Sequence, residues 1–361
     1  MLPIPLLLMA AAATEIPAPP GVVIDHQPAA TRQYIGSPSI VILADGAYVA
    51  SHDFFGPGST QSTSAVTRTF RSTDRGQTWE RTAEFNDQFW SNLFVHRNKL
   101  YLMGTTCEYG RVVIRRSTDG AKTWSSPAYI TDDPNYHTAP VPVAIHQGRI
   151  WRAMEYHPPG PWGFFQALMF SAPVNADLMD PKSWHATEHL AYPATAAEGK
   201  HWLEGNAIAA RDGTLLDILR VDNVEKAALV KVAGDRLQFD RLTDFPGGAK
   251  KFTIRYDRKT RRYWALANPA PGAKAPASVR NTLALISSAD LINWRVDRTL
   301  ITHPDAVKHG FQYVDWQFDG KDIVAAVRTA VDDDSGGAHN FHDANYLIFL
   351  RVPDFRRTMD R

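Results

Sequence analysis

Cysteine is almost absent from this chain of 361 residues. Cys107 is the single cysteine, which excludes an intrachain disulfide and a zinc site built from cysteines. Spaced metal-ligand motifs are missing as well, because neither an HExxH pair nor an EF-hand loop is present. The acidic run at residues 330–337, AVDDDSGG, is more typical of a solvated turn than of a calcium loop. No metal site is therefore predicted from spacing.

An excess of charge of either sign is also lacking. The chain has 39 Lys and Arg against 38 Asp and Glu, a net charge of +1. This balance argues against a nucleic-acid partner, which would require a broad positive surface. Any positive patch must be local, and a local patch suits a small anionic group in a cleft.

Long hydrophobic runs are missing except at the N-terminus, which reads MLPIPLLLMAAAATE. The apolar run at residues 2–13 is too short to span a membrane, and no membrane partner is expected. Its apolar stretch followed by small residues predicts a signal peptide over residues 1–13 and a secreted or periplasmic protein, although no Lys or Arg precedes the run. The alternative is a disordered apolar N-terminus on a cytosolic protein.

Helical periodicity is scarce, and one hairpin pattern recurs instead. Short alternating or β-branched runs are joined by turn pairs such as Asp-Gly and Gln-Gly, which is typical of β-hairpins. The spacing of roughly 50 residues between these hairpins is in the range of propeller blades. The turns lie at Gly46, Asn98, Gly148, Gly213, Lys259 and Gly320.

These repeats predict an all-β fold, a single β-propeller of four-stranded blades over residues 21–356. Six blades are counted, and the irregular spacing leaves room for seven. The run at 21–26, GVVIDH, has no preceding strand, and the C-terminal run NYLIFLRV has no following one. Pairing of these two segments would close the propeller.

A second repeat supports the same fold. The segments RSTDRGQTW (71–79) and RSTDGAKTW (116–124) share Ser-Thr-Asp followed by Trp, and SSADLINW (287–294) is a degenerate copy. The Asp accepts hydrogen bonds from turn N–H groups, and the Trp packs into the blade. These segments resemble the Asp boxes of sialidase-like β-propellers, which lie at the rim and indicate fold rather than chemistry.

Candidate functional residues lie where the inner strands begin and where the second strands end, because loops converge there on one face. His137 precedes a strand, and a structural hydrogen bond is its alternative role. Tyr156 follows an alternating run, where core packing is equally compatible. Arg220 ends an apolar run and either pairs with Glu204 or Asp222 or binds a substrate carboxylate.

Three segments resemble β-propeller polysaccharide lyases, namely the ulvan lyases and the L-rhamnose-α-1,4-D-glucuronate lyases, with related rhamnosidases on the same scaffold. They are SPSIVILADGAYVASHDFFGPG, YHTAPVPVAIHQGRIWRAMEY and WLEGNAIAARDGTLLDILRVD, and the resemblance extends from about Arg32 to Arg356. In that family two histidines, a tyrosine and an arginine surround the uronate. The resemblance therefore implies catalytic roles for His137, His157 and Arg220. The family places its tyrosine shortly before the arginine, where this chain has His201-Trp202-Leu203-Glu204, so Tyr156 is the substitute.

The resemblance implies β-elimination at a uronic acid of an acidic polysaccharide or oligosaccharide. Arg220 would bind the C6 carboxylate and stabilise the enediolate. His137 would remove the C5 proton, and Tyr156 or His157 would protonate the departing oxygen. The residues expected to bind substrate are His52, Trp90, Trp202, Glu204, Asn206, Arg255, His339 and His342.

Glycoside hydrolysis on the same propeller is the alternative. Sialidases use a Tyr nucleophile assisted by a Glu, an Asp acid and three arginines around the substrate carboxylate, one of them in an Arg-Ile-Pro motif that opens the first blade. The corresponding segment here, residues 34–39 (YIGSPS), has no arginine. The related rhamnosidases imply a role for His52, and a propeller that binds sugar without turnover is the third possibility.

No cofactor is required by these schemes. A structural divalent cation such as calcium would fit the central channel if backbone carbonyls and Asp315 converge there, although no spacing demands it.

Overall fold

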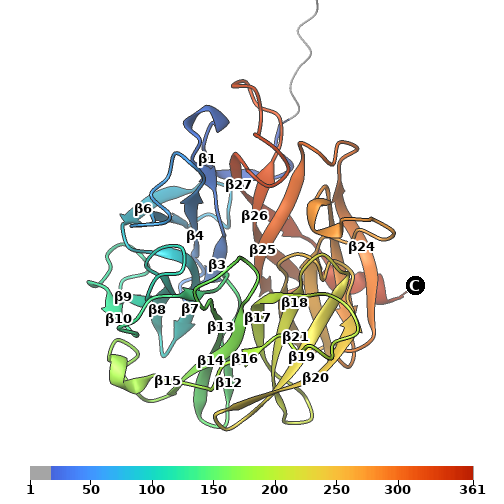
Figure 1. Cartoon of the computed structure of the whole chain (residues 1–361). Coiled ribbons are helices and arrows are strands. Elements are labelled where there is room, and N and C mark those ends of the chain that lie inside the picture. Colours follow the sequence, from blue (N-terminus) through green and yellow to red (C-terminus); the bar gives the residue numbers. More distant parts are fainter. Residues whose placement is uncertain (1–17, 361) are drawn as a thin grey trace, which may run out of the picture.

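The computed structural model describes residues 18–360, and the predicted signal peptide over residues 1–13 lies outside the described residues. The strands form six antiparallel sheets arranged as blades around a central axis (Figure 1). This confirms the predicted all-β propeller and its count of six blades. None of the helices in the described part of the chain is long and apolar enough to cross a bilayer.

The first three blades follow one another along the chain, each with its first strand innermost. Blade 1 contains β2 (Tyr34–Ile35), β3 (Ser39–Ile42), β4 (Tyr48–Phe55), β5 (Thr67–Ser72) and β6 (Glu80–Phe85). Blade 2 contains β7 (Phe89–His96), β8 (Lys99–Thr105), β9 (Val112–Ser117) and β10 (Ala128–Tyr129). Blade 3 contains β11 (Tyr136–His137), β12 (Ala144–His146), β13 (Arg149–Tyr156), β14 (Gln166–Pro173), β15 (His185–Ala186) and β16 (Leu190–Ala191).

The last three blades repeat this arrangement. Blade 4 contains β17 (Trp202–Ala209), β18 (Leu215–Val221), β19 (Lys226–Ala233) and β20 (Arg236–Asp244). Blade 5 contains β21 (Thr253–Asp257), β22 (Arg262–Ala267), β23 (Thr282–Ser288) and β24 (Trp294–Thr302). Blade 6 contains β25 (Gly310–Asp319), β26 (Asp322–Ala330), β27 (Tyr346–Val352) and β1 (Val22–His26).

The propeller is closed by its two ends, as predicted. The N-terminal strand β1 is the outermost strand of blade 6 and pairs antiparallel with β27, with Val22 opposite Phe349 and His26 opposite Tyr346. Because the first strand completes the last blade, no blade is left with a missing strand, and the ring cannot open without breaking this ladder.

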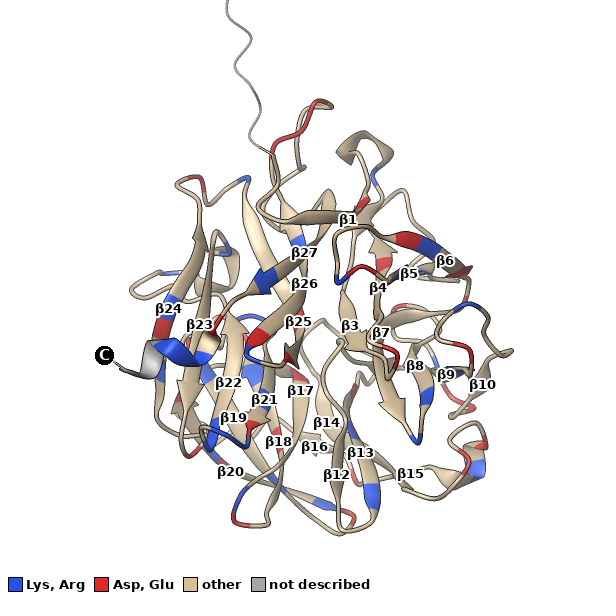
Figure 2. Ribbon diagram, turned by 180° about the vertical axis from the view of Figure 1, so that it is seen from behind, with Lys and Arg blue, Asp and Glu red and all other residues tan. Residues whose placement is uncertain are grey.

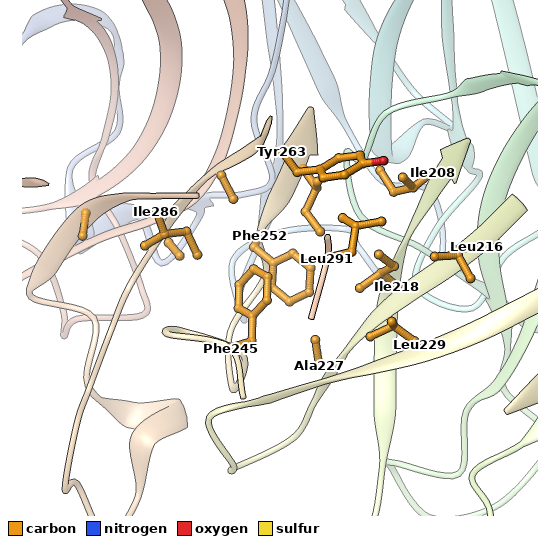
Figure 3. Packing of buried hydrophobic residues seen from close by; sticks show 14 residues of the cluster. Ile208, Leu216, Ile218, Ala227, Leu229, Phe245, Phe252, Tyr263, Ile286 and Leu291 are labelled. Carbon is orange, nitrogen blue, oxygen red and sulfur yellow. The ribbon is translucent and has the colours of Figure 1, made fainter. Parts of the chain in front are cut away.

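Hydrophobic side chains fill the space between neighbouring blades. Between blades 4 and 5, Phe245 stacks on Phe252 with ring centroids 4.1 Å apart, and Ile218 and Tyr263 pack beside them (Figure 3). Alternation along each strand sends every second side chain into such a layer. Basic and acidic positions are interspersed along the ribbon, which agrees with the balanced composition (Figure 2).

The Asp-box turns join the third and fourth strands of blades 1, 2 and 5. Asp119 accepts hydrogen bonds from the backbone N–H of Lys122 and Thr123 at 3.1 and 2.9 Å and from the Thr123 hydroxyl at 2.6 Å. Asp74 and Asp290 bind their own turns in the same way. Each carboxylate thus satisfies several turn N–H groups at once.

Replacing the Asp-box carboxylate tests whether these turns affect only stability. We expect Asp119→Ala to lower the free energy of unfolding by about 1 kcal/mol, because the turn N–H groups lose the carboxylate acceptor and bind water in its place. Chemical denaturation measures this change. An altered KM in the same variant would contradict a purely structural role.

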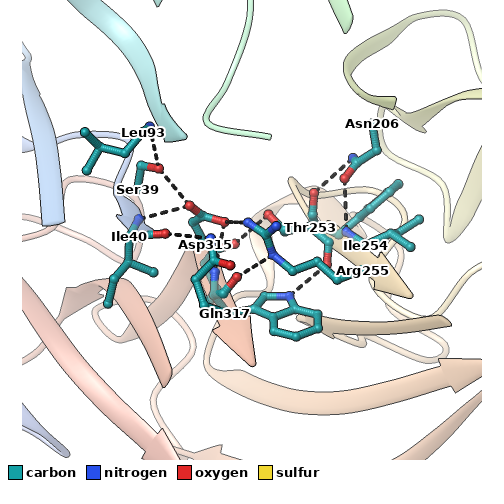
Figure 4. Close-up of polar contacts among 12 residues, drawn as sticks. Ser39, Ile40, Leu93, Asn206, Thr253, Ile254, Arg255, Asp315 and Gln317 are labelled. Atoms are coloured by element: carbon teal, nitrogen blue, oxygen red, sulfur yellow. Dashed lines mark hydrogen bonds and ion pairs between the residues drawn. The ribbon is translucent and has the colours of Figure 1, made fainter. Parts of the chain in front are cut away.

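A polar cluster surrounds Asp315 of β25, beside a second pocket that Asp315, Arg255 and Gln317 line. The Asp315 carboxylate accepts hydrogen bonds from the Ser39 hydroxyl at 2.7 Å and the Ile40 N–H at 3.0 Å, and it pairs with Arg255 at 3.1 Å (Figure 4). Donors therefore surround the carboxylate. The expected cation at Asp315 does not fit this arrangement, because a cation needs free oxygens rather than N–H and guanidinium groups.

Candidate functional site

A pocket of about 410 Å³ lies on the face where the inner strands begin. All six blades contribute to its wall, so the site is assembled from residues far apart in the sequence. The polar and aromatic lining residues are Ser37, Asp53, Phe55, Gln61, Phe89, Trp90, Glu108, Tyr109, His137, Trp162, Glu204, Arg220, Asp222, Ser278, Arg280, Tyr313, Arg328, Phe341 and His342.

The inner strands of blades 2, 4 and 6 share one backbone feature beside this pocket. Each ladder shifts register at its start, and the displaced residue has a left-handed conformation, with φ of 45° at Trp90, 59° at Glu204 and 53° at Tyr313. Left-handed backbone is costly for residues other than Gly, Asn and Asp, and such strain concentrates at functional sites. The repeated bulge turns three side chains toward the pocket.

Acidic side chains of the preceding blades hold two of these bulges. Asp53 of β4 accepts the N–H of Trp90 at 2.6 Å, and Glu155 of β13 accepts the N–H of Gly205 at 2.9 Å. Asp53 also accepts the N–H of Ser37 at 2.8 Å, and Gly36 leaves room for it, since a Cβ there would lie 1.7 Å from the carboxylate. These hydrogen bonds therefore hold neighbouring blades together beside the pocket.

Three buried arginines from blades 4, 5 and 6 form one side of the pocket. Arg220 ends β18, Arg280 precedes β23 and Arg328 lies on β26, and each is less than a tenth exposed. Burial lowers the pKa of Arg280, and burial together with the nearby Arg280 lowers the pKa of Arg328 to about 10. The three guanidinium groups make this side strongly cationic.

Two of these arginines lack an anionic partner. Arg220 pairs with Glu204 at 2.9 Å and with Asp222 at 3.6 Å, but no ion pair within 4.0 Å joins Arg280 or Arg328 to a carboxylate among residues 18–360. Arg280 donates to the Ala277 carbonyl and the Gln312 side chain. Arg328 donates to the His342 carbonyl. Unpaired buried cations are costly, and an anionic ligand would offset that cost.

Tyr313 and Glu204 are joined through Arg220. Burial alone would lower the pKa of Arg220, but the charge of Glu204 and the nearby Tyr313 hydroxyl raise it above its ordinary value. The Tyr313 hydroxyl also interacts with Arg280, and Arg328 lies 4.8 Å from its ring centroid. Tyr313 and Glu204 therefore act on the same guanidinium group.

Asp53 is the lining carboxyl with the most perturbed acidity. Burial raises its pKa to about 6, although the N–H groups of Ser37 and Trp90 oppose this shift. Each carboxyl oxygen has two lone pairs, so the acid can carry a proton while both backbone hydrogen bonds remain. Asp53 can therefore donate or accept a proton at mildly acidic pH.

Aromatic rings from blades 2 and 3 form the opposite side. Trp90 meets His137 edge to face at 4.4 Å, and Tyr109 stacks on His157 at 4.4 Å. His137 Nδ1 lies 2.8 Å from Glu155, so its other ring nitrogen is left for the pocket. Burial raises the pKa of Tyr109 to about 12, which keeps its hydroxyl protonated. The pocket thus has a cationic side and an aromatic side.

The structure brings together five of the residues expected from the sequence. His137, Arg220, Trp90, Glu204 and His342 all line the pocket. Burial and the nearby Arg328 lower the pKa of His342 to about 3, so its imidazole is neutral.

The other expected catalytic residues are not brought to the pocket wall. Tyr156 stands on the opposite face of β13 from Glu155 and packs against Tyr136 and His189. His157 is buried beneath Tyr109, with its Nε2 3.3 Å from the Pro161 carbonyl. Tyr156 therefore does not fill the tyrosine role expected of it.

Several expected substrate-binding residues have structural partners instead. His52 has no exposed side-chain surface, lies 2.8 Å from Asp25 of β1 and does not line the pocket. Trp202 is buried and donates to the Phe165 carbonyl, and Asn206 joins blades 4 and 5 by accepting the Ile254 N–H. Arg255 belongs to the Asp315 cluster and lines the second pocket.

His339 lies on the loop beside the pocket without lining it. Its ring is stacked on Tyr34 with centroids 5.7 Å apart, and its Nδ1 is 2.7 Å from Asp343. In the part of the chain that the structure describes, no group of three or more His, Cys, Asp or Glu side chains is arranged to hold a metal ion.

Sequence reasoning missed the residues that distinguish this pocket, namely Asp53, Tyr109, Trp162, Arg280 and Tyr313. The sequence predicted Arg328 at the end of a second strand and gave it no role. The available signals were the charge of Arg280 in a loop and of Arg328 in the apolar run at 323–331. Both become informative only when the blades are aligned by structure.

No family model and no curated protein matches this sequence. Solved structures share its fold. A protein of unknown function from Dyadobacter fermentans aligns with a TM-score of 0.62 and 13% identity over 92% of this chain and 97% of its own. The α-L-arabinanase of Penicillium chrysogenum, complexed with arabinobiose, gives 0.58 and 11% over 92% and 97%. Trypanosoma rangeli sialidase with the inhibitor DANA gives 0.60 and 12% over 91% and 56%. The chain therefore has a sialidase-like β-propeller fold.

Proposed function

We propose that this protein is a glycoside hydrolase that cleaves a terminal sugar bearing a carboxylate, with retention of configuration. The observation that carries the proposal is the pair of buried guanidinium groups, Arg280 and Arg328, which face the pocket and have no carboxylate partner within 4.0 Å in the described part of the chain. A bidentate guanidinium–carboxylate pair suits this arrangement.

In the first step Tyr313 is the nucleophile. Its phenol oxygen attacks the anomeric carbon while its proton passes to Glu204, and the bond from that carbon to the leaving oxygen breaks. Asp53 donates its proton to the departing oxygen. Arg220 and Arg280 stabilise the negative charge that develops on the phenol oxygen. A neutral phenol avoids the repulsion that a carboxylate nucleophile would meet at an anionic sugar.

In the second step water replaces the leaving group. Asp53, now ionised, accepts a proton from the water as its oxygen attacks the anomeric carbon. The bond from that carbon to Tyr313 breaks, and Glu204 returns the proton to the phenol. Two displacements at the same carbon restore the original configuration.

Structures with this fold support a sugar substrate. The arabinanase relative is described in complex with arabinobiose, and the sialidase relative is described with sialic acid and with 2,3-difluorosialic acid as a covalent intermediate. At 11 to 14% identity these relatives share the fold, and the substrate assignment depends on the pocket itself.

A panel of chromogenic glycosides tests the proposal. The panel contains the α-ketoside of N-acetylneuraminic acid, a β-glucuronide, an α-L-arabinofuranoside and an α-L-rhamnoside. We expect turnover of a carboxylate-bearing glycoside and no turnover of the two neutral ones. Turnover confined to neutral glycosides would contradict the proposal.

β-Elimination at the same pocket is the second candidate, because Tyr109 stands beside His137 and supplies a tyrosine that the sequence did not reveal. Hydrolysis is favoured because Arg220 is the arginine that a lyase would use to bind the uronate carboxylate. Arg220 already forms an ion pair with Glu204 at 2.9 Å. Incubation with ulvan and with gum arabic separates the two, since only a lyase produces an unsaturated uronate that absorbs in the ultraviolet.

The pH dependence of turnover tests the role of Asp53. A general acid must be protonated in the free enzyme, and burial raises the pKa of Asp53 to about 6. We therefore expect kcat/KM to fall tenfold per pH unit above about pH 6. The measurement is a pH profile with a substrate that needs leaving-group protonation, and a profile that stays flat to pH 8 would exclude Asp53 as the acid.

A further inference from the structure

An exposed aromatic residue stands at the rim of the pocket, on the loop between β13 and β14. Trp162 is 53% exposed and lines the pocket, and Phe164, two residues later, is 58% exposed without lining it. Large exposed aromatic side chains beside a site are uncommon without a binding role.

Trp162 is held by two aromatic neighbours while about half of it stays exposed. It meets Phe165 at an interplanar angle of 88° and His201 at 70°, with centroids 5.8 and 6.0 Å away. Both are edge-to-face contacts. Perpendicular contacts with two neighbours fix the orientation of the indole. Its exposed part, about half of the residue, is available to a ligand.

The position of Trp162 relative to the proposed chemistry indicates which part of a substrate would meet it. The arginines that would bind the carboxylate come from blades 4, 5 and 6, whereas Asp53 and Trp162 come from blades 1 and 3. The acid acts on the leaving oxygen, so the leaving group extends toward the aromatic side.

The charge on the aromatic side excludes an anionic leaving group. Glu108 lines the pocket there, and its partners are the side chains of Gln61 at 3.0 Å and Ser62 at 3.3 Å rather than a cation. An uncharged sugar ring, with C–H groups on one face and hydroxyls at its edge, fits a tryptophan face beside hydrogen-bonding side chains.

We propose that Trp162 forms the leaving-group subsite and stacks on a neutral pyranose, so that the substrate is an oligosaccharide in which an acidic terminal sugar is linked to a neutral one. This inference rests on the proposed hydrolase function. It assigns Trp162 to substrate specificity and not to the bond-breaking step.

The test compares two substrates with the same acidic sugar. In sialyllactose the leaving group is a neutral sugar with a pyranose ring. In the fluoride of N-acetylneuraminic acid the leaving group is a fluoride ion, which has no ring. We expect Trp162→Ala to lower kcat/KM for sialyllactose by roughly tenfold and to leave kcat/KM for the fluoride within about twofold. Trp162→Tyr should restore most of the loss, and Phe164→Ala is the matched control that should leave both values unchanged.

The outcomes separate the two proposals. If the wild-type protein hydrolyses neither substrate nor the corresponding uronides, the proposed hydrolase function fails. If the wild-type protein hydrolyses both and Trp162→Ala affects both equally or neither, the subsite assignment is wrong while the hydrolase proposal stands. An equal effect of Phe164→Ala would show that the loop, not the indole, is responsible.

Discussion

Replacing Tyr313 with phenylalanine is expected to lower kcat by about 10³-fold or more, because the substitution removes the attacking oxygen and leaves the ring in place. The Tyr313 ring packs near Arg280 and Arg328, at 5.5 and 4.8 Å, and these contacts persist in the variant. Binding of a carboxylate-bearing product should therefore change little. Steady-state kinetics and a product titration measure the two effects.

Trapping distinguishes loss of the nucleophile from general damage to the site. A 2,3-difluorinated acidic sugar should add its mass to the wild-type chain at Tyr313 and leave Tyr313→Phe unmodified. Glu204→Gln is a useful companion, since it keeps the phenol but removes its proton acceptor, and it should slow labelling without abolishing it. Labelling of Tyr313→Phe at another residue would reassign the nucleophile.

Much of the fold could be predicted from the sequence because its signals are local. Each inner hairpin carries its own turn pair and alternating strands, and each Asp box contains its hydrogen-bond acceptor and its Trp within nine residues. Closure between β1 and β27 followed from counting, since one strand was left over at each end.

The site was harder to predict because the direction of each side chain depends on its exact position along a strand and on β-bulges. A shift of one residue along a strand sends a side chain to the opposite face. On β13 this placed Glu155, not Tyr156, toward His137. Tyr313 and Glu204 reach the pocket through bulges in which the left-handed residue is not glycine, and a sequence gives no sign of such bulges.

Two of the three arginines on the cationic side were harder to predict for a different reason. Arg280 lies in a loop rich in Pro and Ala, and Arg328 lies within an apolar strand, so neither belongs to a motif. They approach one another only because blades 5 and 6 are neighbours in the ring. Blade 1 lacks the Arg-Ile-Pro arginine of sialidases, and Arg328 of blade 6 lines the pocket.

Removing one of the unpaired cations should change binding and stability in opposite directions. We expect Arg328→Met to raise KM for a carboxylate-bearing substrate by about 10²-fold, because a buried guanidinium–carboxylate contact is lost. We expect the free energy of unfolding to rise by about 1 kcal/mol, because a buried charge without a carboxylate partner is replaced by an apolar side chain of similar length. Kinetics and chemical denaturation on the same variant measure both.

Arg351→Met is the matched control in the same blade. Arg351 pairs with Asp319 at 2.8 Å and with Asp322 at 3.2 Å, away from the pocket, so its removal should lower stability and leave KM unchanged. A structural arginine and a substrate-binding arginine are thus distinguished by the sign of the stability change. If Arg328→Met lost stability and kept its KM, Arg328 would be a structural arginine, and Arg280 would be left to bind the carboxylate.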